Sequence, residues 1–583
     1  MKLSDYVVSY LQSQGISHGY FMIGGAIGHL ADSCARNGFL LYTLHHEQSA
    51  AFAAEGQAAI TRKPGVAMAT SGPGATNLVT GIGSAYFSSQ PIVFITGQVN
   101  TFESNLDGKR RQVGFQETDI VSIVKCITKY AKQVTDPSAI VYEMEKALFT
   151  AKSGRMGPVL LDIPFNVQSA EIDPAAQRHF LGSPEHAKMC EKPLPGKAAL
   201  DKIVSLLSSS KRPIVLLGHG AKLSGAEGKV RKFMGQANVP VVATLMGTDV
   251  VENEDPLYFG FIGTYADRHS NLAVANSDLV IVLGARLDSR QVGVQAAKFA
   301  PGAKIVHVDI DQNELGAAVK EEVSVVSDVG DFLDSLLPLL PSAPPNRAEW
   351  LGFLDSLKSR YHEVRQAAES HGAGISPKLA ISELCRVSKE GDVVSVDVGS
   401  HQMWFAQSWK AKKGQLVLTN GGMGPMGCSV PTAIGISTSD GMRPVFVVVG
   451  DGSLQVNIQE LQALARHNIP VKIMVINNRA LGMLTQFQSE NFEGRLIGSV
   501  EGYDAPDFVK VAHAYGIAAD RAEATDGLRA KVEWLASQKG PALLDVRTPR
   551  EFWVLPKSSF ARPVHDMKPY LAEQELKQAL KYV

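Results

Sequence analysis

Short runs of apolar residues recur along the chain and alternate with longer stretches in which apolar residues follow a helical spacing. Runs such as residues 279–283 and 445–449 contain no polar position. Such unbroken runs are typical of strands that lie in a parallel sheet and are buried on both faces. Their alternation with helical stretches predicts repeated βα units, and therefore an α/β fold.

The apolar runs fall into three blocks, which two proline-rich stretches separate. These stretches cover residues 165–195 and 338–345, and proline continues neither a helix nor a central strand. We therefore expect three doubly wound parallel-sheet domains over residues 1–167, 190–342 and 370–560, with a C-terminal tail over residues 561–583. The predicted strands are residues 65–69, 91–95 and 159–163 in the first block, 213–217, 239–243, 278–282 and 304–308 in the second, and 392–396, 444–448, 471–475 and 542–546 in the third.

The composition excludes several classes of protein. The chain has 583 residues and a formal net charge of −1, with no basic block beyond residues 109–111, so a nucleic-acid partner is not expected. No apolar run approaches the roughly 18 residues that a membrane-spanning helix needs. The five cysteines are scattered without a C-x-x-C pair, so neither a disulfide framework nor a zinc site is predicted. The N-terminus lacks the apolar segment of a signal peptide, and we expect a soluble, cytoplasmic protein.

Glycine is somewhat enriched, with 53 residues, and many glycines follow predicted strands. In open α/β sheets, ligands bind beyond the carboxyl ends of the strands, and glycine there lets backbone N–H groups approach a phosphate closely. For any single site, an ordinary tight turn between a strand and a helix is the alternative. The sites in question are residues 72–74, 218–220, 284 and 450–452.

The most informative segment is Gly450-Asp451-Gly452, which follows one predicted strand, together with Asn478, which follows the next. Their separation fits one βαβ unit of about 30 residues, so the two strand ends should lie side by side. Asp451, Asn478 and a nearby backbone carbonyl would then form an all-oxygen site. Such a site suits Mg²⁺, which binds through one or two carboxylates and substrate phosphates. The alternative, an N-cap aspartate and a turn asparagine, does not explain the paired spacing.

The G-D-G and N-N segments at this spacing resemble the diphosphate-binding motif of thiamine diphosphate (ThDP) enzymes. The resemblance extends over nearly the whole chain and points to the acetolactate synthase branch. That branch has a pyrimidine-binding, an FAD-binding and a diphosphate-binding domain in this order, which implies these roles for the three blocks. The segments that carry the resemblance read LHHEQSA, TSGPGATN, FQE, GPVLLDIP, GARLDSR, QMW and LGM, and begin at Leu44, Thr70, Phe115, Gly157, Gly284, Gln402 and Leu481.

The resemblance implies roles for individual residues. Glu47 corresponds to the glutamate that hydrogen-bonds the aminopyrimidine ring of ThDP and promotes loss of a proton from the thiazolium ring, so it would be a buried proton-relay carboxyl group. Gln116 and Lys129 match positions of carboligases and are the other catalytic candidates. Met426 would wedge between the two rings of ThDP, and the Gly424 carbonyl would hold its amino group. The alternatives are a helix-start glutamate for Glu47, a surface helix residue for Gln116 and core filling for Met426.

The remaining candidates are grouped by ligand. Mg²⁺ would be held by Asp451, Asn478 and the carbonyl of Ala480. ThDP would also contact Gly24, Gly25, Pro73, Asn77, His401, Gln402, Gly450, Gly452, Ser453, Leu481 and Met483. FAD is implied for the middle domain, although some members of the superfamily bind ADP there, or nothing, and Arg286 and Arg290 have surface ion pairing as an alternative. The FAD candidates are Arg155, Gly218, Gly220, Thr244, Leu245, Gly284, Arg286, Asp288, Arg290, Asp309 and Asp328.

The reaction that the resemblance implies is that of a ThDP-dependent carboligase. Decarboxylation of pyruvate would leave a hydroxyethyl carbanion on the cofactor, and this would add to a second carbonyl compound, as in acetolactate synthase. A pyruvate oxidase and a simple 2-keto acid decarboxylase are alternatives, although the His-His pair of pyruvate decarboxylases is missing after the later strand of the first block. A cofactor-free scaffold is the non-enzymatic alternative, but it would be expected to have lost Glu47 and Asp451.

Four departures from the acetolactate synthase pattern leave the acceptor open. Phe487 stands where these enzymes typically have tryptophan, and the loop at residues 106–115 is long and basic. The F-D-D-R motif of the family reads Leu-Asp-Ser-Arg at residues 287–290, and the tail at residues 553–557 and 563–569 resembles carboligases of branched-sugar synthesis. The alternative acceptor is a keto-sugar nucleotide or another ketone, whose phosphates would pair with Lys109, Arg110 and Arg111. The resemblance also implies a homodimer or homotetramer, in which Glu47 of one chain faces the diphosphate domain of another.

Overall fold

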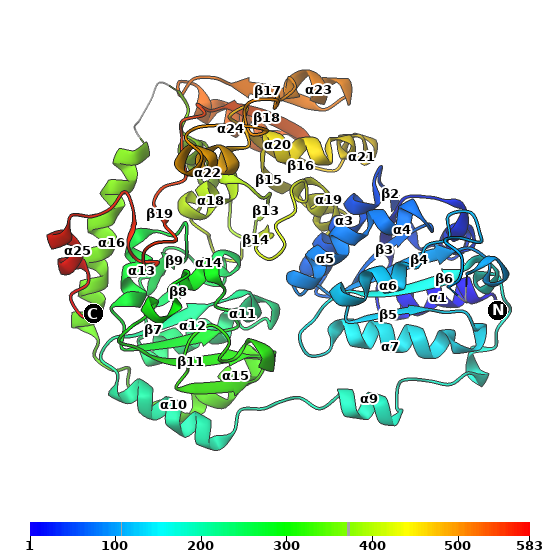
Figure 1. Ribbon diagram of the computed structural model, residues 1–583, viewed down its shortest axis with the longest axis horizontal. Coiled ribbons are helices and arrows are strands. Elements are labelled where there is room, and N and C mark those ends of the chain that lie inside the picture. Colours follow the sequence, from blue (N-terminus) through cyan, green and yellow to red (C-terminus); the bar gives the residue numbers. More distant parts are fainter. Residues whose placement is uncertain (106–107, 370–373) are drawn as a thin grey trace.

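The computed structural model of the protein describes residues 1–105, 108–369 and 374–583. The described chain forms three six-stranded sheets of parallel strands, with helices on their faces (Figure 1). A short antiparallel ribbon of β19 (Lys557–Ser558) and β20 (Met567–Lys568) lies near the C-terminus. The predicted α/β fold with three parallel sheets is confirmed.

The N-terminal sheet has the strand order β2-β1-β3-β4-β6-β5. The order reverses between β1 and β3, and open α/β sheets bind ligands in the crevice that such a reversal leaves beyond the carboxyl ends of the strands. The strands are β1 (His18–Phe21), β2 (Leu40–Thr43), β3 (Gly65–Ala69), β4 (Ile92–Gln98), β5 (Tyr130–Gln133) and β6 (Val159–Pro164), and the main helices are α1 (Leu3–Ser13), α2 (Gly28–Arg36), α3 (Glu47–Thr61), α4 (Pro73–Asn77), α5 (Val79–Phe87) and α7 (Ile140–Lys152).

The middle sheet has the order β12-β11-β10-β7-β8-β9. Read from β9, this is the order 3-2-1-4-5-6 of dinucleotide-binding folds, whose ligand crosses the point where the order reverses. The strands are β7 (Pro213–Leu217), β8 (Val241–Ala243), β9 (Tyr258–Phe261), β10 (Leu279–Leu283), β11 (Lys304–Asp309) and β12 (Val323–Val326), and the main helices are α10 (Lys197–Ser209), α11 (His219–Leu223), α12 (Glu227–Ala237), α13 (Arg268–Ala275), α14 (Ser289–Val292), α15 (Val329–Leu336) and α16 (Ala348–Glu369).

The C-terminal sheet has the order β14-β13-β15-β16-β18-β17. Counted from its own first strand, this is the order of the N-terminal sheet, so the two outer domains share one topology. The strands are β13 (Val393–Val396), β14 (Leu416–Thr419), β15 (Val445–Gly450), β16 (Val471–Asn477), β17 (Ala518–Ala522) and β18 (Ala542–Arg547), and the main helices are α17 (Pro377–Val387), α18 (Ser400–Ser408), α19 (Ser429–Ser439), α20 (Asp451–Val456), α21 (Leu461–His467), α22 (Gly482–Asn491), α23 (Phe508–Ala514) and α24 (Leu528–Ser537).

The two outer domains are joined through α3 and α19, which lie side by side between their sheets (Figure 1). The crossing is reciprocal. A side chain on Gly56 of α3 would collide with the backbone at Thr432, and a side chain on Gly435 of α19 would collide with the backbone at Ala53. The helices can approach this closely because small residues, mostly alanine, fill the facing surface of α3. The result is one continuous apolar core that includes residues of both domains.

The predicted strands match the central strands of each sheet, but the prediction omits β1 and all six edge strands. Edge strands such as β5 (Tyr-Ala-Lys-Gln) and β17 (Ala-Ala-Asp-Arg-Ala) have partly buried and exposed positions, so they lack an unbroken apolar run. The pattern of burial in the sheet therefore decides which strands the sequence reveals.

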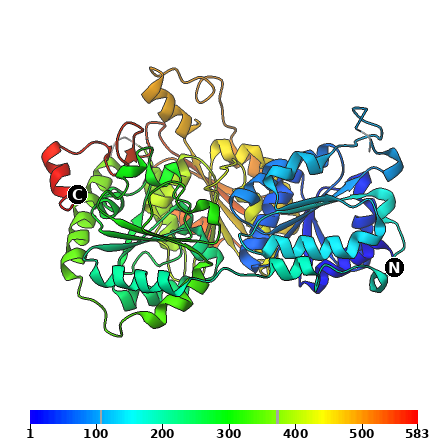
Figure 2. The same cartoon turned by 60° about the horizontal axis from the view of Figure 1, so that its bottom comes forward.

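A view turned about the horizontal axis shows the C-terminal segment lying over the middle domain, far from the N-terminal sheet (Figure 2). The buried guanidinium group of Arg268, on α13, donates to the carbonyl oxygens of Met567 at 3.0 Å and Pro569 at 2.6 Å. Helix α25 (Glu573–Ala579) ends this segment. The expected domain limits stay predictions, and the limit at residue 370 lies outside the described residues. Among the described helices, none has the length and apolarity to cross a membrane.

Candidate active site

The predicted metal residues meet at the carboxyl ends of β15 and β16, which are adjacent parallel strands. The backbone N–H of Ala480 donates to Asn478 Oδ1 at 3.2 Å and also hydrogen-bonds the Asp451 carboxyl group. Asp451 is the first residue of α20, where the helix dipole favours a negative charge. The structure therefore brings Asp451, Asn478 and Ala480 together, as their spacing in the sequence predicts.

The Asp451 carboxyl group is almost completely buried, with 2% exposure, and burial raises its pKa to about 6. Tyr503 donates its hydroxyl hydrogen to Asp451 Oδ2 at 3.1 Å, whereas Arg479, which also feels the charge of Asp451, is exposed and forms its ion pair with Asp504 at 2.8 Å. A buried carboxylate without a directly bonded cation is costly. The surroundings of Asp451 therefore fit a bound cation.

The set of oxygen atoms also fits Mg²⁺ rather than a metal that prefers histidine or cysteine. Within the described ranges, no group of three or more His, Cys, Asp or Glu side chains could hold a metal ion. One carboxylate, one amide and one backbone carbonyl form an incomplete shell, which Mg²⁺ commonly completes with phosphate oxygens and water. The residues present thus fit a Mg²⁺–diphosphate pair.

The candidate ThDP residues of the C-terminal domain surround the same turn. Gly450 lies against the His401 ring, and a Cβ atom added to this glycine would lie 2.7 Å from His401 Nδ1. Gly452 lies against Met426 and Leu481. The Nε2 atom of His401 is buried without a hydrogen-bond partner among the described residues, and burial lowers the pKa of this histidine to about 4. A buried ring nitrogen without a protein partner is a fit for a polar group of a ligand.

Other residues of this set have different surroundings. Ser453 donates to the carbonyl of Val398 at 2.9 Å, and Met483 packs against the apolar core behind the sheet. Gln402 donates to Thr419 Oγ1 at 2.8 Å and to Asn420 O at 2.9 Å. Gly424 has a φ of +71°, a conformation that favours glycine, and its N–H donates to Asn420 Oδ1 at 3.2 Å.

The pyrimidine-side candidates form a second cluster at the carboxyl ends of β1, β2 and β3. Glu47, with 6% exposure, is the first residue of α3 and accepts from Asn77 Nδ2 at 2.9 Å. An added Cβ on Gly74 would lie 3.1 Å from Glu47 Oε1, and one on Gly24 would collide with Thr70. Pro73 begins α4, and Gly25 begins a 3₁₀ turn. Five residues from three loops therefore converge here, as the family resemblance implies.

The two other catalytic candidates differ in position. Gln116 has a φ of +65° and lies against Gly72, so it borders the pyrimidine-side cluster. Lys129 precedes β5, whose first residue pairs with the first residue of β6, so it lies at the amino edge of the sheet. Its ammonium group caps the end of α7 by donating to the carbonyls of Thr150 and Ser153, both at 2.5 Å, and burial lowers its pKa to about 8. Within one chain, Lys129 and Glu47 therefore lie at opposite edges.

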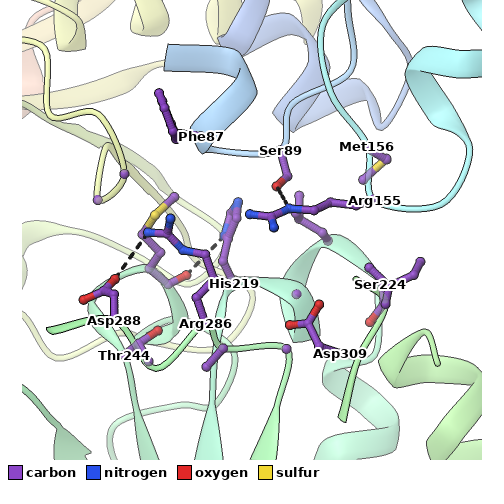
Figure 3. Close-up of a pocket in the computed structure, with 18 of the residues that line it drawn as sticks. Phe87, Ser89, Arg155, Met156, His219, Ser224, Thr244, Arg286, Asp288 and Asp309 are labelled. Atoms are coloured by element: carbon purple, nitrogen blue, oxygen red, sulfur yellow. Dashed lines mark hydrogen bonds and ion pairs between the residues drawn. The ribbon is translucent and has the colours of Figure 1, made fainter. Parts of the chain in front are cut away.

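A cavity of about 980 Å³ lies at the carboxyl edge of the middle sheet (Figure 3). All the FAD candidates except Gly218 line it. Gly218 lies just behind, where an added side chain would collide with the backbone of Gly284. Gly220 and Gly284 are in similar contact, since an added Cβ on Gly220 would lie 2.8 Å from Gly284 Cα. Only glycines allow these two turns to pack backbone to backbone beside the cavity.

Charged groups lie on opposite sides of this cavity (Figure 3). Arg155 donates to Ser89 Oγ at 3.0 Å and forms ion pairs with Asp311 and Glu314, whereas Arg286 pairs with Asp288 at 3.3 Å. Asp309, the last residue of β11, and Asp328, which follows β12, also line the cavity. Burial raises the pKa of both carboxyl groups. Arginines suit phosphates, and carboxylates at strand ends suit ribose hydroxyls. This arrangement fits a dinucleotide such as FAD.

Sequence reasoning missed several residues that these sites use. Tyr503 contacts Asp451, Asn420 holds the Gly424 turn, and the fully buried Glu460 accepts from His45 N at 3.1 Å, next to Glu47. Burial raises the pKa of Glu460 to about 7. No short motif marks these residues, because Tyr503 and Glu460 bond to partners far away in the sequence and the contact of Asn420 with Gly424 depends on the shape of the turn.

Comparison with known proteins agrees with this geometry. Family profiles described as the N-terminal TPP binding domain, the central domain and the C-terminal TPP binding domain of thiamine pyrophosphate enzymes match residues 1–123, 200–336 and 397–546.

Similar proteins include "Acetolactate synthase 2, chloroplastic" of Nicotiana tabacum, which is 37% identical over 569 residues, 95% of this chain and 83% of that protein. "Acetolactate synthase, chloroplastic" of Arabidopsis thaliana is 36% identical over 570 residues, 95% of this chain and 82% of its own. "Probable acetolactate synthase large subunit" of Methanocaldococcus jannaschii is 34% identical over 565 residues, 94% of this chain and 92% of its own. The chain therefore belongs to the thiamine pyrophosphate enzymes, and within them to the acetolactate synthase-like group.

Proposed function

We propose that the protein is a ThDP- and Mg²⁺-dependent carboligase that decarboxylates pyruvate and joins the remaining two-carbon unit to a second carbonyl compound. The observation that carries this proposal is the convergence of Asp451, Asn478 and Ala480 beside Gly452 and Met426. Membership of the acetolactate synthase-like group supports the choice of reaction. When bound, ThDP supplies the stabilised carbanion that amino-acid side chains do not provide.

The residues of the C-terminal domain would bind and orient the diphosphate. Asp451, Asn478 and the Ala480 carbonyl would hold Mg²⁺, and the buried ring of His401 would lie beside the diphosphate. Met426 and Leu481, which both lie against Gly452, would exclude water from the space between the rings. Exclusion of water strengthens electrostatic interactions inside the site.

Glu47 would hold a proton against the ring nitrogen of the aminopyrimidine. Asn77 fixes its carboxyl group through the bond to Oε2, which leaves Oε1 for the cofactor. Gln116, beside Gly72, would border the substrate. The role of Lys129 stays a prediction, and in a single chain it caps α7.

The complete site requires two copies of the chain. The bond from Asn77 keeps Glu47 within the N-terminal domain, whereas Asp451 bonds to Tyr503 and Ala480 of the C-terminal domain. Glu47 of one copy would face the Asp451 site of the other, so a homodimer is the smallest active unit, and a homotetramer would pair two dimers. Exposed apolar side chains beside both clusters support such an interface, namely Met22, Ile23, Phe115 and Val456.

FAD would occupy the 980 Å³ cavity of the middle domain without being consumed. The acceptor we favour is a second 2-keto acid. The alternative of a keto-sugar nucleotide rests on the basic loop and on Phe487, which is 43% exposed on α22, and residues 106–107 of that loop lie outside the described residues. A cytoplasmic location also stays a prediction.

Identification of products tests the proposal. The purified enzyme, supplied with ThDP and Mg²⁺, is incubated with pyruvate alone and then with a panel of 2-keto acids, aldehydes and keto-sugar nucleotides. A branched hydroxyketo acid from pyruvate alone supports the proposed reaction, and a product only with a sugar acceptor supports the alternative. Acetaldehyde or acetate as the sole product with every acceptor would contradict carboligation. The absorbance spectrum of the purified protein shows whether flavin is bound.

A further inference from the structure

A second buried glutamate lies on α3, about two turns beyond Glu47. Glu55 has 7% exposure, and its carboxyl group contacts the hydroxyl of Ser84, on α5. Its Oε1 atom has no hydrogen-bond partner among the described residues. Buried carboxyl groups are rare unless they are paired, so this position calls for an explanation.

A chain of hydrogen bonds leads from Glu55 into the C-terminal domain. Ser84 Oγ accepts from Asn420 Nδ2 at 2.5 Å, so the hydroxyl hydrogen of Ser84 is free to point at Glu55. Asn420 Oδ1 in turn accepts from the N–H of Gly424 at 3.2 Å. Glu55 is thus linked through two side chains to the turn that carries Gly424 and Met426.

Glu55 lines a cavity of about 140 Å³, where all three domains meet. Two other buried polar atoms of lining residues, Ser88 Oγ and His219 Nε2, also lack partners in the described chain. At roughly 30 Å³ per water molecule, the cavity has room for a few ordered waters. Such waters would satisfy the unpaired oxygen of Glu55 and these two atoms.

The Arg and Lys side chains among the described residues that line this cavity are already paired. Arg62, on the same helix, pairs with Glu227 at 3.0 Å, and Lys222, on α11, pairs with Asp249 at 2.6 Å. The other titratable groups on the cavity are His219 on α11 and Cys428 before α19. Burial raises the pKa of Glu55 to about 8 and lowers that of His219 to about 3, so both are uncharged near neutral pH.

We propose that Glu55 is a positioning residue, which acts through Ser84 and Asn420 to hold the turn of Gly424 and Met426 in place. The uncharged carboxyl group fits this role, because nothing around it compensates a negative charge. Because burial raises the pKa of Glu55 in the folded protein, its carboxyl group is uncharged at low pH and holds the turn fully. This support of the turn is lost as the pH rises through about 8. The inference rests on the proposed function only in assigning this turn to ThDP.

The first test needs no cofactor. Hydrogen–deuterium exchange is measured on the peptide that covers residues 420–426 in the ThDP-free protein, for wild type, Glu55→Gln, Glu55→Ala and Ser84→Ala. We expect hydrogen exchange about fivefold to tenfold faster in Glu55→Ala and in Ser84→Ala, and near wild-type exchange in Glu55→Gln. The double variant that combines Glu55→Ala with Ser84→Ala should show no further increase, because both changes break the same chain of hydrogen bonds. Wild-type exchange in a folded Glu55→Ala protein would overturn the inference.

The second test is the pH profile of ThDP binding, measured by calorimetry with Mg²⁺ from about pH 6 to pH 9. Wild type should bind more weakly as the pH rises above about 8, and Glu55→Gln should abolish this loss. Asp162→Asn is the control, because Asp162 is another buried carboxyl group of the N-terminal domain with a pKa raised to about 6, and it bonds instead to Thr96 and Gln98.

The outcomes of these tests separate the two proposals. An unchanged alkaline loss of ThDP binding in Glu55→Gln would overturn the role of Glu55. If wild type does not bind ThDP at any pH, the proposed function fails, and the exchange experiment still decides the role of Glu55. If Glu55→Ala does not fold, Ser84→Ala and the pH profile of Glu55→Gln decide it instead.

Discussion

The N-terminal and C-terminal domains have the same strand order, and both place their candidate residues at the carboxyl edge of the sheet. Their chemistry differs. The C-terminal domain presents Asp451 at the start of α20, bonded to Tyr503, whereas the N-terminal domain presents Glu47 at the start of α3, held by an amide. One topology thus carries the candidate diphosphate site in one domain and the candidate proton-holding site in the other. The difference arises in the loops, in agreement with the rule that fold alone does not fix function.

The two domains also differ in how local their sites are. The candidate diphosphate site comes from two segments, residues 450–452 and 478–480, at the carboxyl ends of the adjacent strands β15 and β16. The Glu47 cluster comes from loops after three strands, and its position further depends on Glu460 of the other domain. A site built from few segments tolerates less change within them, whereas a site built from many can be altered from a distance.

The largest effect is expected for Asp451→Ala, which removes the single carboxylate of the metal site. Loss of groups that only support a metal ligand typically weakens binding 10–100-fold, so loss of the ligand itself should weaken Mg²⁺-dependent ThDP binding by more than about 100-fold. Calorimetric titration of ThDP measures this. Asp504→Ala is the control, since Asp504 is an exposed residue nearby that pairs with Arg479 at 2.8 Å. Undiminished binding in Asp451→Ala would refute the metal site.

Glu47→Gln should separate catalysis from binding. The amide keeps the shape of the side chain and the helix start, but it cannot hold the proton, so turnover should fall by about 100-fold or more while ThDP affinity changes little. Steady-state kinetics and the ThDP titration give the two values. If ThDP affinity falls as far as in Asp451→Ala, the proposed division of roles between the domains is wrong.

Glu460→Gln probes the support of Glu47 from the other domain. Burial raises the pKa of Glu460 from 4.5 to about 7, so the folded protein holds a proton that the unfolded chain releases, and stability decreases as the pH rises from about 4.5 to 7. The variant should lose this decrease, which amounts to at most about 3 kcal/mol. Thermal unfolding at about pH 5 and pH 8 measures the change.

The same Glu460 variant has a kinetic readout. Turnover should fall modestly, since His45 N loses a charged acceptor and Glu47 is less well fixed. Glu322→Gln is the control, because this glutamate is on the surface of the middle domain. A wild-type pH dependence of stability in Glu460→Gln would show that Glu460 is not the group responsible.

The smallest effect is expected at the helix crossing that joins the two domains. Gly435→Ala places a methyl group against the backbone of α3 and should destabilise the protein by about 1–3 kcal/mol. Gly235→Ala, within α12 and with open space around it, should be neutral or stabilising by about 0.5–1 kcal/mol. Denaturant unfolding compares the two. Equal stability of both variants would mean that the crossing adapts, contrary to its backbone-to-backbone contact.

The sequence indicates the central strands of all three sheets except β1, because a strand buried on both faces is apolar at nearly every position. It does not indicate the edge strands such as β17, whose polar and exposed residues look like a loop. Asp451 and Asn478 are predictable for a related reason, since residues that directly follow adjacent strands must lie close together. The assignment of Glu47 depends on the family resemblance, since a glutamate at a helix start has no distinctive spacing.

The roles of Glu55, Glu460 and Asn420 were not predictable from the sequence. Glu460 and Asn420 bond to partners several hundred positions away, and Glu55 reaches the C-terminal domain only through Ser84 and Asn420, so local patterns carry no information about these contacts. The same holds for the 980 Å³ cavity, whose wall includes residues of all three domains.

The sequence by itself therefore determined the α/β class, the three parallel sheets, the family and the diphosphate turn, because each of these follows from a periodic or local pattern. Only the tertiary structure decided that the two outer domains share one topology, that α3 and α19 cross through Gly56 and Gly435, and that Glu55 reaches the Gly424 turn. These features depend on which distant surfaces pack together, and packing is a property of shape that no short stretch of sequence contains.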